Sequence, residues 1–376
     1  MAALTLSGRG QVIGRKWGQL EWVGRNKMNQ ATPRLGKKQH ATIREVAEMA
    51  GVSQMTVSRV LNRRESVKES TREKVEEAIQ ALNYRPNLLA RSLAGGKSLF
   101  IGLIFNNPSN NYLGELLVGT LNRCREAGHH LVIEDFSITS RDKEIDALIE
   151  RISGAGLDGV IVAPPVSEDE LILSKLHAAG LRTVLIAPRE APNDGVSVSI
   201  DDAAAADQMT QYLIDHGHKR IAFVIGATDQ SSSRRRYRGF DLAMARNGLS
   251  VDDNLVQQGD YTYRSGLVAG EHFFSLPQPP SAVFASNDDM AAGVLAAAQR
   301  HGMRVPEDVS IVGFDDTAIA SAMWPQLTTV RQPIAEMAYQ AVNLLARVIG
   351  DVESPKKDRN LVLDVAIVER DTVRKA

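Results

Sequence analysis

The sequence predicts two kinds of domain in one chain: a small all-α head near the N-terminus, and a larger α/β body with parallel sheets in two lobes. Two short amphipathic runs separated by a glycine lie within residues 43–62. From residue 99 onward, short runs rich in Val and Ile alternate with amphipathic helical patterns. A length of 376 residues with 43% hydrophobic content fits two or three packed domains rather than a disordered chain.

The charge of the chain is balanced as a whole but divided along its length. Residues 1–97 carry 18 Lys and Arg against 8 Asp and Glu, and the remainder carries 26 against 37. A basic N-terminal quarter on an acidic body is typical of a nucleic-acid-binding head attached to a sensing or catalytic domain. A basic segment that is merely solvated is the alternative at this point.

Residues 1–40 form a basic extension that we expect to be mostly disordered. Glycines and basic residues interrupt its apolar stretches, so no secretory signal is predicted, and Met28 is an alternative start. No run in the chain reaches the length of a membrane span. The single Cys124 excludes an intramolecular disulfide and a multi-cysteine metal site, so we expect a cytoplasmic protein without a metal or cofactor.

The first element of the head is a helix that begins after Thr42. Glu45 follows three residues later and completes a capping-box pattern, and Gly51 tolerates the positive φ that ends a helix. Ser53 is the expected cap of a second helix, whose buried stripe contains Val57 and Val60. Two short helices joined by a tight glycine turn make a helix-turn-helix.

The second helix carries side chains suited to DNA at its leading end. Gln54 can bond adenine bidentately, Arg59 can bond guanine, and Met55 offers an apolar surface to a thymine methyl group. Thr56 and Ser58 are better suited to phosphate, which sets register without reading sequence. A helical hairpin inside some other domain is the alternative, and the basic N-terminal context disfavours it.

A third helix closes the head, with Ser70 as its expected cap and Val75, Ala78 and Leu82 in its core stripe. Pro86 stops this helix, and Asn87 can cap a short one that runs to Leu93. The expected domains are therefore an extension at 1–40, the helix-turn-helix at 41–85, a hinge helix and linker at 86–98, and the body at 99–376.

The stretches "TIREVAEMAGVSQMTVSRVLN" and "YRPNLLARSLAGGKS" together closely resemble the bacterial LacI-type transcriptional repressors. The resemblance implies that the segment after Pro86 is a hinge helix that orders on operator DNA and wedges Leu93 into a base step. The family often carries Lys where this chain has Ala94. The residues then expected at DNA are Thr42, Ser53, Gln54, Met55, Thr56, Ser58, Arg59, Asn62, Asn87, Arg91 and Leu93.

The body contains seven apolar runs without polar alternation, each followed by a helical pattern: "LFIGLIF", "HLVIED", "GVIVAP", "TVLIAP", "IAFVIG", "SAVFAS" and "SIVGF". Such runs predict parallel sheets covered on both faces. Because "FIGLIF" and "RIAFVIG" begin similar series about 120 residues apart, two lobes are favoured over one sheet. The resemblance implies the same periplasmic-binding-protein-like body, with a cleft at the carboxyl ends of the strands.

Polar residues that follow the predicted strands are expected to line this cleft. By the family's motifs, the effector-contacting positions are Asn107, Tyr112, Gln230, Ser232, Arg236, Tyr261, Asn287, Asp315 and Gln332. Arg, Asn and Asp side chains can saturate vicinal hydroxyls, and an aromatic ring can stack on a sugar. Asp288 and Asp316 also follow predicted strands, next to Asn287 and Asp315. The alternative to a place in the cleft is that Asp288 faces solvent and that Asp316 caps a turn or helix. Many family members carry Asp where this chain has Ala187.

The favoured function is a homodimeric repressor whose affinity for a pseudo-palindromic operator is controlled by a small molecule. The resemblance favours a sugar or sugar derivative, and a nucleobase or other metabolite acting as co-repressor is the alternative. A solute-binding receptor lacks a basic head, and an enzyme lacks support because no nucleophile elbow, phosphate loop or zinc-protease helix appears. No leucine heptads follow "LVLDVAIVERDTVRKA", so a dimer is expected, with its face on the helix at 112–127.

Overall fold

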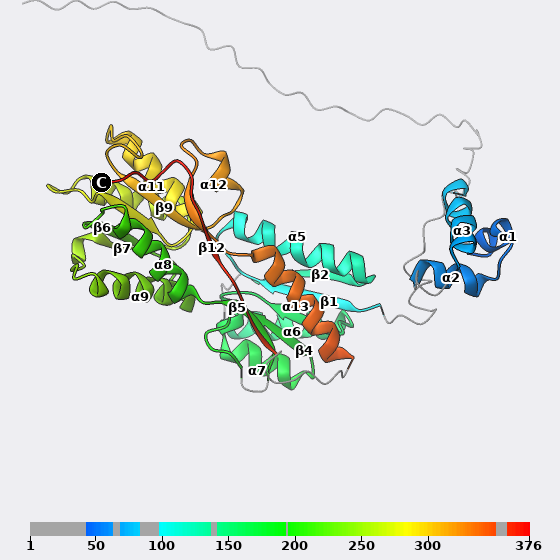
Figure 1. Ribbon diagram of the computed structural model, residues 1–376. Coiled ribbons are helices and arrows are strands. Elements are labelled where there is room, and N and C mark those ends of the chain that lie inside the picture. Colours follow the sequence, from blue (N-terminus) through cyan, green and yellow to red (C-terminus); the bar gives the residue numbers. More distant parts are fainter. Residues whose placement is uncertain (1–42, 63–67, 83–97, 137–140, 193–194, 351–358) are drawn as a thin grey trace, which may run out of the picture. The chain divides into compact units, whose positions relative to one another are not determined.

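The computed structural model describes residues 43–62, 68–82, 98–136, 141–192, 195–350 and 359–376 (Figure 1). The chain divides into two compact units, Met1–Pro86 and Asn87–Ala376. They are the head and the body, and each is treated by itself below. The expected extension at 1–40 and all of the expected hinge segment except Ser98 lie outside the described residues.

The head consists of α1 (Ile43–Ala50), α2 (Gln54–Asn62) and α3 (Glu69–Ala81). Gly51 has the positive φ of 64° expected between the first two helices, and the Ser53 Oγ accepts a hydrogen bond from the Thr56 amide at 3.1 Å. The expected cap of α3 is wrong: the helix already begins at Glu69, so Ser70 lies inside it. A glutamate in the first turn complements the helix dipole without a side-chain cap.

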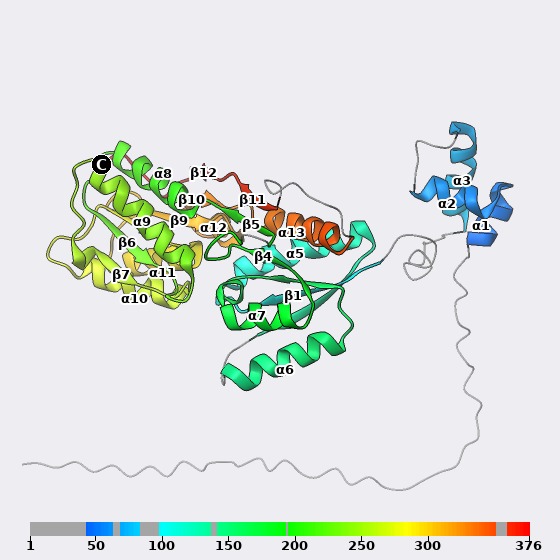
Figure 2. The same cartoon turned by 90° about the horizontal axis from the view of Figure 1, so that it is seen from below.

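The first lobe of the body is a six-stranded parallel sheet in the order β11-β5-β4-β3-β1-β2 (Figures 1 and 2). Its strands are β1 (Phe100–Phe105), β2 (His130–Asp135), β3 (Gly159–Val162), β4 (Arg182–Ile186), β5 (Ser197–Ile200) and β11 (Asn360–Leu363). The helices of this lobe are α5 (Asn110–Ala127), α6 (Arg141–Gly154), α7 (Glu170–Ala178) and α13 (Ile334–Ile349), with the short η2 (Val166–Glu168) before α7.

The second lobe repeats this plan with the strand order β12-β10-β9-β8-β6-β7, in which β12 alone runs antiparallel to its neighbour among the described strands. Its strands are β6 (Ile221–Ile225), β7 (Val256–Gln258), β8 (Ala282–Ala285), β9 (Ser310–Asp315), β10 (Thr328–Arg331) and β12 (Ala366–Val368). Its helices are α8 (Asp202–Asp215), α9 (Ser231–Arg246), α10 (Tyr263–Phe274), α11 (Asp288–Arg300) and α12 (Ala318–Ala322), with η3 (Asp253–Leu255) before β7.

The predicted α/β body with parallel sheets in two lobes is confirmed. The chain crosses between the lobes three times. It passes from β5 of the first sheet to α8, which packs in the second lobe, from β10 of the second sheet to α13, which packs in the first lobe, and from β11 of the first sheet to β12 of the second. Three short connections of this kind allow the lobes to rotate about a common hinge.

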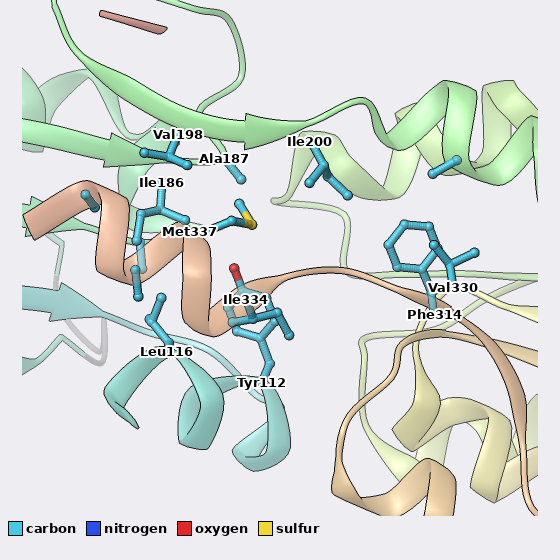
Figure 3. Close-up of a cluster of buried hydrophobic side chains, with 14 of the residues drawn as sticks. Tyr112, Leu116, Ile186, Ala187, Val198, Ile200, Phe314, Val330, Ile334 and Met337 are labelled. Atoms are coloured by element: carbon cyan, nitrogen blue, oxygen red, sulfur yellow. The ribbon is translucent and has the colours of Figure 1, made fainter. Parts of the chain in front are cut away.

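Apolar side chains fill the space around α13 (Figure 3). Tyr112 and Leu116 of α5 lie near Ile334 and Met337 of α13, and all four are buried. The contact between these helices depends on Gly119, where an added Cβ would lie 2.1 Å from the carbonyl oxygen of Ala335. Tight packing of α5 on α13 therefore fixes the start of α5 at the cleft.

Candidate functional site

The outer face of α2 presents the side chains that the sequence predicts for DNA. Gln54, Met55 and Arg59 are exposed, while Val57 and Val60 on the opposite face are buried against α1 and α3. At about 100° per residue, the three exposed positions span about 140° of the helix. They form one exposed surface, with Met55 between the polar side chains of Gln54 and Arg59. A recognition helix needs such an exposed surface at its start to reach base edges in the major groove.

Other predicted DNA residues have different surroundings. The hydroxyls of Ser53 and Thr56 lie 2.9 Å apart and bond each other at the start of α2, where Ser53 also caps the helix. Ser58 and Asn62 lie on α2, but their side chains are outside the described part of the structure, as are Thr42, Asn87, Arg91 and Leu93 entirely.

The structure brings all nine predicted effector residues together. Asn107, Tyr112, Gln230, Ser232, Arg236, Tyr261, Asn287, Asp315 and Gln332 line one cavity between the two lobes, and Ser109, Pro164, Ala187 and Asp202 complete its lining. The cavity has a volume of about 390 Å³. The site is therefore a partly open space between the lobes, and most of the residues that line it are polar.

Arg236 of α9 is the centre of the polar network. Its Nε donates to Asp202 Oδ1 at 2.9 Å, its Nη1 to the carbonyl oxygen of Ser286 at 2.6 Å, and its Nη2 to Gln332 Oε1 at 3.0 Å. The guanidinium also lies 3.6 Å from the ring centroid of Phe314. These contacts hold a buried guanidinium in one orientation, because each donor direction has its own partner.

Two acidic side chains lie next to this cation. Asp202 is buried and also accepts from Arg235 Nη2 at 2.9 Å, while Asp315 Oδ1 lies 3.6 Å from Arg236 Nη1. Burial raises the pKa of Asp315 well above its usual range, although the charge of Arg236 opposes this shift. The carboxyl of Asp315 is thus a strongly desolvated group that gains from any hydroxyl donor placed beside it.

The opposite wall is built around Tyr261. Its hydroxyl lies 3.1 Å from Ser232 Oγ and accepts from Ser233 Oγ at 2.9 Å, and its carbonyl oxygen accepts from Asn287 Nδ2 at 3.0 Å. Burial raises the pKa of both Tyr112 and Tyr261, so both phenols stay protonated. Tyr261 therefore orients Asn287, whose Oδ1 also accepts from the Met290 amide as the cap of α11.

The backbone is strained around the cavity. Ala187, Tyr261 and Asp315 line it, and all three adopt positive φ, at 43°, 68° and 115°. Non-glycine residues in this region cost about 1 to 3 kcal/mol each and cluster at functional sites. These three strained residues lie together at the cleft, and sequence patterns give no signal of the strain.

Both structural alternatives for the neighbouring aspartates are wrong. Asp288 does not face solvent: it is buried and accepts from the Thr317 amide at 2.8 Å and from Thr329 Oγ1 at 2.6 Å. Asp316 does not cap a turn but pairs with Arg331 and Arg370, each at 2.6 Å. These two carboxylates hold the loops behind the cavity rather than lining it.

Asp202, Ser109 and Pro164 are the lining residues that sequence reasoning missed. Asp202 follows β5, a strand of four residues whose serines at alternate positions interrupt any apolar run, so the sequence gives no signal of a strand there.

The histidines considered for a metal are bonded within the protein: His216 Nδ1 lies 2.8 Å from the carbonyl oxygen of Tyr212, and His218 Nδ1 lies 3.0 Å from Ser281 Oγ. Among the described residues, no group of three or more His, Cys, Asp or Glu side chains could hold a metal, and no helix is long and apolar enough to cross a membrane.

A helix-turn-helix head with an exposed polar reading face, followed by two hinged lobes around a polar cavity, defines a DNA-binding protein that responds to a small ligand. Two family models match the chain: "Bacterial regulatory proteins, lacI family" over residues 42–87, and "Periplasmic binding protein-like domain" over residues 210–373.

Known relatives agree with both matches. The chain is 38% identical over 310 residues to catabolite control protein A of Priestia megaterium, covering 82% of this chain and 92% of that protein. It is similar to the transcriptional regulator CelR in complex with cellobiose (31% identity, TM-score 0.67, 89% of this chain and 100% of that one). It is also similar to the lac repressor dimer bound to operator and an anti-inducer (27%, 0.66, 89% and 100%).

The chain therefore belongs to the LacI family of bacterial regulatory proteins. It is a DNA-binding transcriptional regulator under effector control, and not an enzyme.

Proposed function

We propose that this regulator is a repressor whose effector is a sugar or sugar derivative bound in the cavity between the lobes. The observation that carries the proposal is the convergence of Arg236, Asn287 and Asp315 on one small polar space, with Tyr112 and Tyr261 in its walls. Buried amide, carboxyl and phenol groups provide donors and acceptors for several neighbouring hydroxyls. The cellobiose bound to the similar regulator CelR supports the same ligand class.

Binding of the effector changes the angle between the lobes. The cavity lies between the lobes, so a sugar enters as they separate and is then held as they close. The three crossings between the sheets are the hinge. The effector shifts operator affinity to the extent that it binds one lobe angle more tightly than the other.

The protein acts as a homodimer on a pseudo-palindromic operator in the cytoplasm. Val118 and Leu121 are 52% and 44% exposed on α5, which places apolar surface on the predicted dimer face at 112–127. The similar lac repressor is a dimer on its operator. Gln54, Met55 and Arg59 read base edges, while Ser53, Thr56, Ser58 and Asn62 contact the DNA nearby.

The division of the chain follows from these roles. Residues 1–40 are an extension, 41–85 the DNA-binding domain, 86–98 the hinge helix and linker, and 99–376 the effector-binding and dimerisation domain. Thr42, Asn87, Arg91 and Leu93 complete the DNA contacts. The two compact units that meet at Pro86 support the boundary between head and hinge.

Fluorescence anisotropy on a pseudo-palindromic operator, with and without a panel of mono- and disaccharides, tests the proposal. We expect tight binding that one sugar changes. Asp315→Asn should remove the sugar response and keep operator binding, because Asp315 belongs to the cavity and not to the head. Asp253→Asn, an exposed change on the same lobe, is the matched control. A full sugar response in Asp315→Asn would remove this residue from the site.

A nucleobase or other metabolite acting as co-repressor is the second candidate. The two cavity tyrosines favour it, because their rings could stack on a planar base. The ring of Tyr261, however, packs against Gly226, where an added Cβ would lie 2.2 Å from the ring carbon Cζ. One of its faces is thus taken by the backbone. A purine panel in the same assay decides between the two classes.

A further inference from the structure

Two carboxylates cross the cleft outside the effector contacts described above. Glu168, from η2 of the first lobe, reaches the N-terminus of α9 in the second lobe. Its Oε1 accepts from the Ser231 amide at 2.9 Å and from Ser231 Oγ at 2.8 Å. The Glu168 side chain is 2% exposed, so this contact is buried between the lobes.

The second carboxylate runs in the opposite direction. Asp289, in the first turn of α11 in the second lobe, reaches the N-terminus of α5 in the first lobe. It accepts from the capping residue Ser109 through Oγ at 2.5 Å and from Asn111 through Nδ2 at 2.6 Å. Each lobe therefore supplies one anion to a helix N-terminus of the other.

Helix N-termini are the places where proteins bind phosphate and other anions, because their amide groups and dipole favour negative charge. Ser231 lies between the cavity residues Gln230 and Ser232, and Ser109 lines the cavity itself. Both N-termini are thus beside the effector site. Glu168 occupies the Ser231 amide of α9 directly, whereas Asp289 contacts α5 through the side chains of Ser109 and Asn111, and Ser109 Oγ itself accepts from the Tyr112 amide. The guanidinium of Arg236 is likewise held by Asp202, Ser286 and Gln332.

We propose that Glu168 and Asp289 are built-in anions that hold the lobes together across the cleft and exclude negatively charged effectors from the site. A phosphate or carboxylate ligand meets the buried Asp202 in the cavity and has to displace Glu168 to reach the amides at the start of α9. The effector is then an uncharged polyol. This last step rests on the effector site proposed above, whereas the closure of the lobes does not.

A third contact crosses the cleft beside Glu168. Arg235 Nη1 donates to the carbonyl oxygen of Arg189 at 3.1 Å and to Ser231 Oγ at 2.7 Å, and Arg189 Nε lies 3.6 Å from Glu168 Oε2. The two lobes move about one hinge. Loss of the contact between Glu168 and Ser231 therefore also loosens the contact between Asp289 and Ser109, and the reverse holds as well. The two carboxylates therefore act on one opening motion.

Hydrogen exchange on the full chain, without DNA or effector, tests the closure. In Glu168→Gln and in Asp289→Asn, amides of 230–233 and of 109–113 should both exchange faster than in the wild-type protein. Glu170→Gln, an exposed change close to Glu168, should leave both segments unchanged. Faster exchange only beside the altered residue indicates a local structural role and overturns the proposal, as does an unchanged rate in both variants.

Inorganic phosphate tests the exclusion of anions. At constant ionic strength set with chloride, phosphate should leave the Tm of the wild-type protein unchanged and raise that of Glu168→Ala, whose α9 N-terminus is vacated. A phosphate-dependent rise in the wild-type protein, or none in a folded Glu168→Ala, contradicts the proposal. If the alanine variant does not fold, Glu168→Gln is measured against phosphate in the same way, because this change removes the charge and keeps the size of the side chain. Neither measurement uses a sugar or an operator, so a failure of the sugar panel is separately visible.

Discussion

Asp202→Asn is the substitution that most directly tests the network under the cavity. The carboxylate is 2% exposed and receives hydrogen bonds from two guanidiniums, from Arg236 Nε at 2.9 Å and from Arg235 Nη2 and Nε at 2.9 and 3.1 Å. Asparagine keeps the shape and one acceptor but removes the charge. Arg236 is then left with Asp315, 3.6 Å away, as its carboxylate partner within the described network.

Removing one partner of a buried ion pair costs about 3 to 5 kcal/mol, because the other charge remains buried and uncompensated. Since asparagine retains one acceptor, we expect a loss of about 3 kcal/mol in the free energy of unfolding of the body. For a domain of this size, about 2 to 4 °C per kcal/mol gives a fall in Tm of roughly 6 to 12 °C.

Urea unfolding followed by circular dichroism measures this loss, with Asp207→Asn as the matched control on the same helix. Asp207 pairs with Arg246 through two hydrogen bonds at 2.7 and 3.1 Å, but both side chains are partly exposed to solvent, so its loss should cost no more than about 1 kcal/mol. A loss below about 1 kcal/mol for Asp202→Asn would refute the view that Asp202 compensates the buried charge of Arg236.

Three further predictions follow from other parts of the structure. Arg59→Ala should weaken specific operator binding by about 1 to 3 kcal/mol and relax specificity at one base position, and equal weakening on all sequences in an anisotropy series would identify a phosphate contact instead. Gly119→Ala should destabilise the body by about 1 to 3 kcal/mol in urea unfolding because its Cβ meets the Ala335 carbonyl, whereas Gly114→Ala, which meets no atom within 4 Å on the same helix, should stabilise it by about 0.5 to 1 kcal/mol. Burial raises the pKa of Asp288 to about 7 from 3.8, so the stability that its protonated form contributes is present below pH 4 and is lost as the pH rises toward 7. Asp288→Asn should remove this part of the pH dependence of the free energy of unfolding, and an unchanged pH dependence would contradict the prediction.

The head could be predicted from sequence because its signals are local. Gly51 ends one helix and Ser53 caps the next through a hydrogen bond that spans three residues, so the pattern and the contact lie in the same short stretch. Ser70 shows the limit of this reasoning. Glu69 and Ser70 are adjacent and both suit the start of a helix, and α3 begins at Glu69 after Lys68.

In the body, the apolar strands were predictable and the short strands that include polar residues were not. Five of the six residues of β1 and four of the five residues of β6 are buried, and both runs stand out against the helices. The strands β5, β7 and β10 have three or four residues and include polar ones. Their extended conformation depends on backbone pairing with neighbouring strands in the sheet, which the local sequence does not show. Because β5 has no apolar run, the sequence also gives no signal that Asp202, two residues after this strand, lines the cleft.

Residue types and family motifs in the sequence already determined which nine side chains would gather at the cleft, and all nine line the cavity. The partners that orient them were decided by the tertiary structure. Asp202 meets Arg236 across 34 positions, Glu168 meets Ser231 across 63, and Ser109 meets Asp289 across 180. Such contacts join different lobes or helices, and no local spacing or periodicity encodes a pairing that exists only when both sheets have formed.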